Sequence, residues 1–108
     1  WGIFLKDQNR LIGQAGIESQ IVDNNGEIML SYFLDKDYRS MGYAREACRK
    51  ILEYAGEDLE FDRIVAVISP DNTSSIRLAA SLGFQRIKET IYQDKPGDLY
   101  VWRKDTVS

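Results

Sequence analysis

The chain has 108 residues, of which 44% are hydrophobic and 29% charged, and its formal net charge is −3 at pH 7. This length predicts one domain with a buried core, and the acidic excess disfavours nucleic acid as a partner, because nucleic-acid binders carry basic surfaces. The chain contains no histidine and one cysteine, Cys48, which excludes histidine-dependent triads, histidine metal ligands and an intrachain disulfide. No apolar run approaches the roughly 20 residues that cross a membrane, and no signal-peptide pattern opens the chain. We therefore expect a cytoplasmic protein.

Three strands are expected in the first third of the chain. Residues 1–6 and 11–18 are rich in apolar residues and flank a short polar segment, a pattern typical of a β-hairpin. The run that starts at Trp1 reads as a strand already under way, so we expect the complete protein to have a segment before it. The sequence Asn-Asn-Gly at 24–26 predicts a turn, followed by a strand over 27–34. Alternation in that strand places Ile28, Leu30, Tyr32 and Leu34 on one face and Met29, Ser31 and Phe33 on the other.

A helix and a buried strand are expected next. Apolar residues recur at helical spacing between 44 and 55, and charged residues fill the opposite face, so this segment predicts an amphipathic helix. Gly56 is its expected end, because glycine is common just after the C-terminus of a helix. The β-branched run at 63–68 predicts a strand that is buried on both faces.

The last third of the chain predicts a second helix and two strands. The helix is expected over 73–82, with its cap among residues 71–73 and Gly83 at its end. Strands are expected over 84–92 and 99–104, separated by the residues Pro96-Gly97-Asp98. Strands before, between and after helices predict a mixed α/β (α+β) fold. Two main helices would pack on a mixed sheet that is antiparallel at its N-terminal side.

The segment 39–44, Arg-Ser-Met-Gly-Tyr-Ala, lies between a predicted strand and a predicted helix. The first N–H groups of a helix lack internal partners and carry partial positive charge, so an anion is their natural guest. Gly42 has no Cβ, which lets a phosphate approach the backbone, and Arg39 adds a guanidinium group. An ordinary loop–helix junction with a glycine in the turn is the other interpretation, and the residues alone leave both open.

Two motifs carry a resemblance to a known family. The run Arg39-x-x-Gly42-Tyr43-Ala44, followed by Glu46-Ala47, resembles the signature of the GNAT superfamily of N-acetyltransferases, in which this turn holds the pyrophosphate of acetyl-coenzyme A. Asn72-x-x-Ser75, followed by Leu82-Gly83-Phe84, resembles the branch that acetylates the N-termini of ribosomal proteins. The resemblance covers most of the chain and implies a single domain over residues 1–108. It also implies a sheet of about six to seven strands, without the family's first strand and first two helices.

The resemblance implies a role for each matching position. The backbone N–H groups of residues 41–44, with the Arg39 side chain, are expected to bind the pyrophosphate. The backbone at Phe33 and Leu34 is expected to pair with the pantetheine arm, in a cleft between the strands at 27–34 and 63–68. The resemblance thus assigns cofactor contacts to Phe33, Leu34, Arg39, Met41, Gly42, Tyr43, Ala44, Asn72, Ser75 and Arg77.

The second motif adds the catalytic candidate. Asn72 is expected to hydrogen-bond the pantetheine or the turn beneath it, and Arg77 to contact the outer phosphate of the nucleotide. Ser75 is expected near the sulfur, where it would donate toward the departing thiolate. Asn72 and Ser75 are also good residues for the start of a helix, so a structural role stays open for both.

Other chemistry-bearing side chains have ordinary explanations. Tyr92 and Tyr100 are candidate acids, although a tyrosine in a strand usually serves packing. Phe33 and Leu34 could equally be core residues. Cys48 falls on the apolar face of the first helix and is expected to be a small buried side chain, not a nucleophile.

Acetyl transfer from a thioester needs a neutral amine, donors for the carbonyl oxygen as it gains charge, and a proton for the departing thiolate. Direct attack in a ternary complex requires neither a protein nucleophile nor a metal, which suits a chain without histidine. The sequence departs from the family at two positions. Met29 stands where many members have a glutamate, and Ala79 where many have a tyrosine. Glu27 shares the parity of Met29 but lies two positions earlier, so the general base is unassigned.

Three functions are compatible with these residues. The first is an N-acetyltransferase that transfers the acetyl group of acetyl-CoA to a primary amine, either a protein N-terminus or a small amine. The alternatives are a non-catalytic acyl-CoA-binding module or sensor, and an α/β interaction domain without a ligand. We expect acetyl-CoA and an amine as partners, no nucleic acid, membrane or metal, and we leave a homodimer open.

Overall fold

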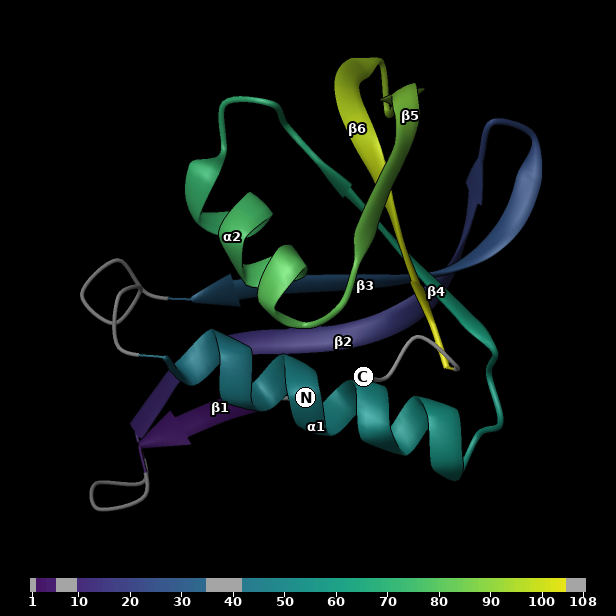
Figure 1. The fold of residues 1–108 in the computed structure, drawn as a ribbon. Helices are drawn as coiled ribbons and strands as arrows, with labels where there is room; N and C mark the ends of the chain where they lie inside the picture. Colours follow the sequence, from purple (N-terminus) through teal and green to yellow (C-terminus); the bar gives the residue numbers. More distant parts are fainter. Residues whose placement is uncertain (1, 6–9, 35–41, 105–108) are drawn as a thin grey trace.

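The computed structural model describes residues 2–5, 10–34 and 42–104 (Figure 1). Its elements follow the predicted order: β1 (Gly2–Leu5), β2 (Arg10–Val22), β3 (Asn25–Leu34), α1 (Tyr43–Glu57), β4 (Arg63–Ile68), α2 (Thr73–Ser81), β5 (Gln85–Tyr92) and β6 (Lys95–Arg103). The strands form a six-stranded sheet in the order β1-β2-β3-β4-β6-β5. β3 and β4 run parallel, and the other neighbouring pairs are antiparallel. The predicted mixed α/β class is confirmed.

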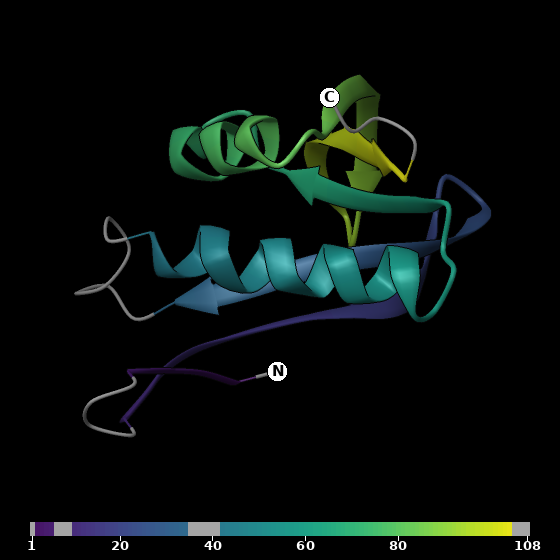
Figure 2. The same ribbon diagram turned by 60° about the horizontal axis from the view of Figure 1, so that its bottom comes forward.

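Both helices lie on the same face of the sheet, in front of it in Figure 1. α1 packs along β1, β2 and β3, and Figure 2 shows that α2 lies beside the end of β4. The predicted apolar face of α1 is confirmed, since its buried residues include Ala44, Cys48, Ile51, Leu52 and Ala55. Burial of one large aliphatic side chain contributes about 1.5–3 kcal/mol, so this face is enough to hold the helix on the sheet.

The opposite face of the sheet has its own apolar cluster. Its buried residues come from β2, β3, β4 and β6: Val22, Met29, Val65, Leu99 and Val101. Ile64 and Val65 are both fully buried, one in each cluster. The prediction that β4 is covered on both faces is therefore confirmed.

The turns of the two long hairpins lie earlier than predicted. The β2–β3 turn is formed by Asp23 and Asn24, with φ of 51° and 66°, and the β5–β6 turn by Gln93 and Asp94, with φ of 52° and 64°. Two successive residues of positive φ characterise the two-residue turn that matches the twist of a hairpin. The predicted turns at 24–26 and 96–98 were wrong, because the glycines that suggested them lie within strands.

Gly97 and Gly56, which predicted a turn and a helix end, instead permit close packing between elements. Gly97 lies inside β6, where a Cβ atom would stand 2.8 Å from Cγ1 of Val67. Gly56 lies inside α1 and does not end it, because the helix continues to Glu57. A Cβ atom at Gly56 would lie 3.2 Å from Cη2 of Trp102, so the glycine lets the helix approach β6.

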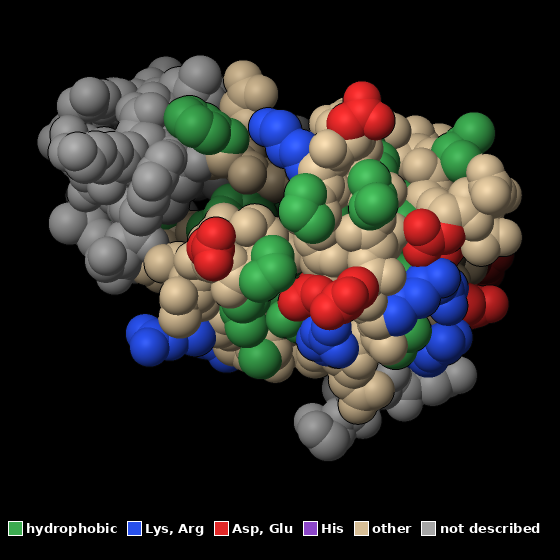
Figure 3. Space-filling model, turned by 90° about the horizontal axis from the view of Figure 1, so that it is seen from above, with side chains coloured by type: hydrophobic (Ala, Val, Ile, Leu, Met, Phe, Trp, Pro, Cys, Tyr) green, Lys and Arg blue, Asp and Glu red, His purple; other side chains and the backbone are tan. Residues whose placement is uncertain are grey.

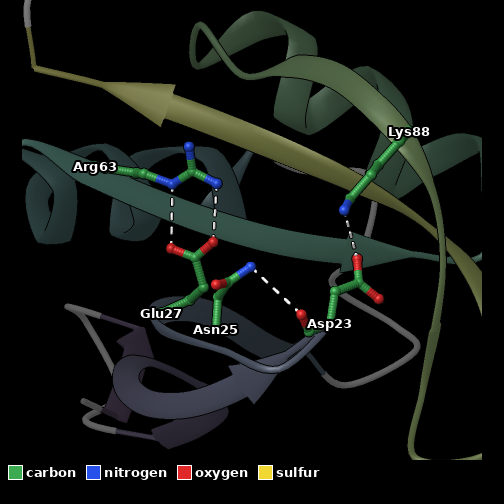
Figure 4. Close-up of polar contacts among 5 residues, drawn as sticks. All are labelled: Asp23, Asn25, Glu27, Arg63 and Lys88. Atoms are coloured by element: carbon green, nitrogen blue, oxygen red, sulfur yellow. Dashed lines mark hydrogen bonds and ion pairs between the residues drawn. The ribbon is translucent and has the colours of Figure 1, made fainter.

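A polar cluster ties the β2–β3 turn to β5 (Figure 4). The Thr90 hydroxyl donates to Oδ1 of Asp23 at 2.7 Å, and Lys88 Nζ lies 2.9 Å from Oδ2 of the same carboxylate. Asn25 Nδ2 donates to the backbone carbonyl of Asp23 at 3.4 Å. The hydrogen bond from Thr90, and then Lys88, lower the pKa of Asp23 below its ordinary value of 3.8.

We expect Asp23→Asn to lower Tm by about 2–5 °C near neutral pH. A carboxyl group whose pKa is lowered by folding stabilises the fold above its unfolded pKa, and this contribution is lost as the pH falls through the folded value. The Tm difference from the unsubstituted chain should therefore vanish well below pH 3.8. Thermal unfolding followed by circular dichroism across the acid range measures it, with Asp94→Asn in the other turn as the matched control. A difference that persisted in full at the acid end would contradict the assignment.

Candidate active site

The parallel strands β3 and β4 are paired at Met29 and Val65 and diverge beyond this point (Figure 1). A cavity of about 290 Å³ occupies the space between their C-terminal halves. α2 closes one side of the cavity, and Phe84 and Tyr92 complete its wall. No charged side chain is found among its described lining residues. The divergence leaves the β4-facing edge of this half of β3 open, which is what an extended ligand pairing with a strand requires.

A second cavity, of about 360 Å³, adjoins the first. It lies between the end of β3, the start of α1 and the start of α2, and Gly42, Ala44 and Arg45 contribute to its wall. Four residues line both cavities: Tyr32, Asn72, Ser75 and Leu78. The two spaces therefore meet beside the first turn of α2.

Gly42 is the N-cap residue of α1, immediately before Tyr43. Its φ of 79° lies in the left-handed region, and in the described part of the chain no side-chain hydrogen bond caps the helix. A Cβ atom added there would meet none of the described residues within 4 Å, and the left-handed backbone conformation by itself favours glycine. The second cavity thus borders the start of α1, where the anion-site interpretation places its ligand.

The first turn of α2 is fixed by Asn72 and Ser75. Asn72 is the N-cap: its Oδ1 atom accepts a hydrogen bond from the Ser75 N–H at 3.2 Å. The predicted helix cap is therefore confirmed at Asn72. The Ser75 Oγ atom lies 2.7 Å from the Tyr32 hydroxyl, a contact between β3 and α2.

The structure brings together part of the predicted site. Phe33 lines the second cavity and is 61% exposed as a residue. Tyr43 is half-buried at the start of α1. Arg77 lies exposed on α2 and is not among the described residues that line either cavity. Arg39, Met41 and the side chain of Leu34 lie outside the described residues, although the Leu34 backbone belongs to β3.

The carboxylate and tyrosine side chains near the site differ in their contacts and burial. Glu27 binds Arg63 through two hydrogen bonds, of 3.1 and 2.8 Å (Figure 4), and it does not line the cavity between β3 and β4. A carboxylate engaged in this way is held as an ion pair and is unsuited to be the base. Tyr100 is buried in the core beneath the helices, whereas Tyr92 lines the cavity.

Cys48 is buried on α1, as predicted. Burial raises the pKa of its thiol to about 11, so it remains protonated near neutral pH and is a poor nucleophile.

Tyr32 is the site residue that the sequence did not single out. Strand alternation places it on the helix face, but its partner Ser75 lies 43 positions away. Only the packing of α2 against β3 shows that the two hydroxyl groups meet.

The described part of the face seen from above carries side chains of both charges (Figure 3). Seen from above, acidic and basic side chains are interspersed with apolar ones (Figure 3). Among the residues that the structure describes, no group of three or more His, Cys, Asp and Glu side chains could hold a metal ion. None of the described helices has the length and hydropathy that would let it cross a membrane.

Comparison with known proteins gives this geometry a family. Residues 1–85 match the acetyltransferase (GNAT) domain. A Bacillus licheniformis protein named "Uncharacterized N-acetyltransferase p20" is 35% identical over 94 residues, which are 87% of this chain and 51% of that protein. The chain thus spans about half the length of the curated relatives it matches.

Solved structures agree in fold. The acetyltransferase from Agrobacterium tumefaciens has a TM-score of 0.81 at 26% identity, over 94% of this chain and 58% of that one. The ribosomal-protein-S5-alanine acetyltransferase from Vibrio fischeri has a TM-score of 0.80 at 23% identity, over 94% of this chain and 59% of that one. From the domain match, the relatives and the arrangement of strands and helices together, the chain belongs to the GNAT superfamily of acetyltransferases.

Proposed function

We propose that this chain binds acetyl-CoA and transfers its acetyl group to a primary amine by direct attack in a ternary complex. The observation that carries the proposal is the pair of adjoining cavities, one beside Gly42 and the other between β3 and β4. A ligand with an anionic group at one end and a long, thin arm fits this arrangement. Its diphosphate would lie at the start of α1, and its thioester between the strands.

Particular atoms are proposed to hold the ligand. The N–H groups of residues 41–44, with Arg39, would bind the diphosphate. The backbone at Phe33 and Leu34 would pair with the pantetheine arm as an added strand does. The Oδ1 atom of Asn72 is engaged in the helix cap, so its amide nitrogen would be the group that contacts the arm. Arg77 stays a candidate for the outer phosphate, without support from either cavity.

The chemistry requires few protein groups. The amine nitrogen attacks the thioester carbonyl carbon, a C–N bond forms, and the C–S bond breaks with its electron pair on sulfur. The amine loses one proton to solvent, and the sulfur gains one, for which Ser75 is the proposed donor. A backbone N–H at the end of β3 would stabilise the carbonyl oxygen as it gains charge.

The cavity itself favours the reactive form of the acceptor. Its described lining is largely apolar and carries no charged side chain, and a low-dielectric environment disfavours the ammonium form of an amine. The neutral nucleophile can therefore be reached without a carboxylate base, in keeping with Met29 at the position where many relatives have glutamate. The solved structure from Vibrio fischeri is named for alanine of a ribosomal protein, which makes a protein N-terminus our first choice of acceptor.

A non-catalytic acyl-CoA-binding module is the second candidate. It is favoured by Met29 and Ala79, which stand where many family members have an acid–base residue. Calorimetric titration with acetyl-CoA tests the shared binding step, and absence of binding would exclude both functions. Thiol release, measured with a disulfide reagent and a panel of peptides and small amines, separates them. Binding without release would select the module. Cys48 should give little background in this assay, because it is buried.

A further inference from the structure

The hydroxyl groups of Tyr32 and Ser75 lie where the two cavities meet. Their oxygens are 2.7 Å apart, and both residues line both cavities. Tyr32 extends from β3 and Ser75 from the first turn of α2, so the contact bridges sheet and helix. Since Asn72 accepts a hydrogen bond from the Ser75 N–H, the serine is held both at its backbone and at its side chain.

This geometry determines where the serine proton can point. A hydroxyl group has one proton to donate and can accept other hydrogen bonds. A phenol is a stronger acid than an aliphatic hydroxyl group, so the favoured arrangement has Tyr32 donating and Ser75 accepting. The proton of Ser75 is then free to point into a cavity.

We propose that Tyr32 is the positioning residue for Ser75 in acetyl transfer. The inference rests on the proposed function, because it requires Ser75 to act on the sulfur. As the C–S bond breaks, its electron pair goes to sulfur, the Ser75 proton moves to the sulfur, and the Tyr32 proton moves to Ser75 Oγ. The proton released by the amine returns to the Tyr32 oxygen through solvent. The result is one amide and one free thiol, with both hydroxyl groups restored.

A double-mutant cycle tests the coupling. Tyr32→Phe removes the hydroxyl group and keeps the ring that packs against the core, and we expect kcat to fall about tenfold with KM for acetyl-CoA within about twofold. Ser75→Ala is expected to lower kcat about hundredfold. The double variant should be no slower than Ser75→Ala by more than about twofold, because Tyr32 acts through the serine. Losses that multiply in the double variant would overturn the proposal, and so would full activity in Tyr32→Phe.

A second measurement does not depend on turnover. Tyrosine labelled at Cζ reports the hydrogen bond of its hydroxyl group by NMR, and Tyr32→Phe assigns the Tyr32 signal. Ser75→Ala should shift this signal, whereas Ser81→Ala, at the other end of the same helix, should not. An unmoved Tyr32 signal in Ser75→Ala would contradict the contact on which the proposal depends.

Control measurements distinguish failure of the proposed acetyl transfer from failure of the proposed role of Tyr32. Tyr54→Phe removes a tyrosine hydroxyl group from α1 and is expected to leave kcat unchanged. An unsubstituted chain that binds acetyl-CoA but acetylates no amine would remove the proposed function, and the role of Tyr32 with it. An active chain in which Tyr32→Phe matches Tyr54→Phe would remove the role of Tyr32 alone.

Discussion

Gly42→Asp is expected to weaken acetyl-CoA binding by about hundredfold. Like charges about 5 Å apart, at an effective dielectric constant of about 20, repel by ~3 kcal/mol, which corresponds to about two orders of magnitude in Kd. Aspartate is among the few residues that tolerate left-handed backbone, the conformation of Gly42 with its φ of 79°. A side chain there would start beside the second cavity, with no described residue within 4 Å of its Cβ atom. Calorimetric titration with acetyl-CoA measures the change.

Gly42→Asn is the matched control for charge. Asparagine has nearly the same shape as aspartate and also tolerates left-handed backbone, so it adds bulk without a negative charge. We expect its Kd to rise less than about tenfold, and added salt to restore part of the affinity of Gly42→Asp only. Equal losses in the two variants would assign the effect to bulk or strain. Unchanged affinity in Gly42→Asp would remove the proposed diphosphate site.

Ser75→Ala is expected to lower kcat about hundredfold and to change Kd for acetyl-CoA by less than about threefold. The reason for this division is that the serine proton matters only as charge develops on the sulfur. The cap of α2 should survive, because Asn72 accepts from the backbone N–H of residue 75 and not from its side chain. Thiol release gives kcat, and titration gives Kd.

Ser81→Ala is the control on the same helix. The Ser81 hydroxyl group donates to the Leu78 backbone carbonyl in the last turn of α2, and Ser81 is not among the described residues that line either cavity. We expect neither kcat nor Kd to change. If Ser75→Ala lost affinity and turnover to the same extent, its serine would serve binding or structure, and the proton donor would have to be sought elsewhere.

Periodicity was sufficient to predict the elements but not their turns. The apolar stripe of α1 and the β-branched run of β4 depend on short-range spacing, which the sequence displays directly. Gly56 and Gly97 were read as local breaks, but each is required by a side chain of another element, Trp102 in one case and Val67 in the other. A glycine that permits a close approach and a glycine that permits a turn look the same in a single sequence.

The candidate site was also predictable only in part from the sequence. Motif spacing indicated Gly42, Asn72 and Ser75, and these residues do border adjoining cavities. The pairing of Tyr32 with Ser75 depends on how closely α2 approaches β3, which no local pattern encodes. Glu27 illustrates the same limit: it shares the strand parity of Met29, but its carboxylate binds Arg63, which lies 36 positions away on another strand.

The last of the described strands, β6, takes a place inside the sheet, between β4 and β5. Arg63 in β4 is aligned with Arg103 in β6. The edge of β4 that pairs with β6 therefore stays open until residue 103 has been synthesised. Closing so long a loop costs chain entropy before its contacts compensate. During synthesis on the ribosome, the β5–β6 hairpin that carries Tyr92, a wall residue of the cavity between β3 and β4, can join the sheet only through this late insertion of β6.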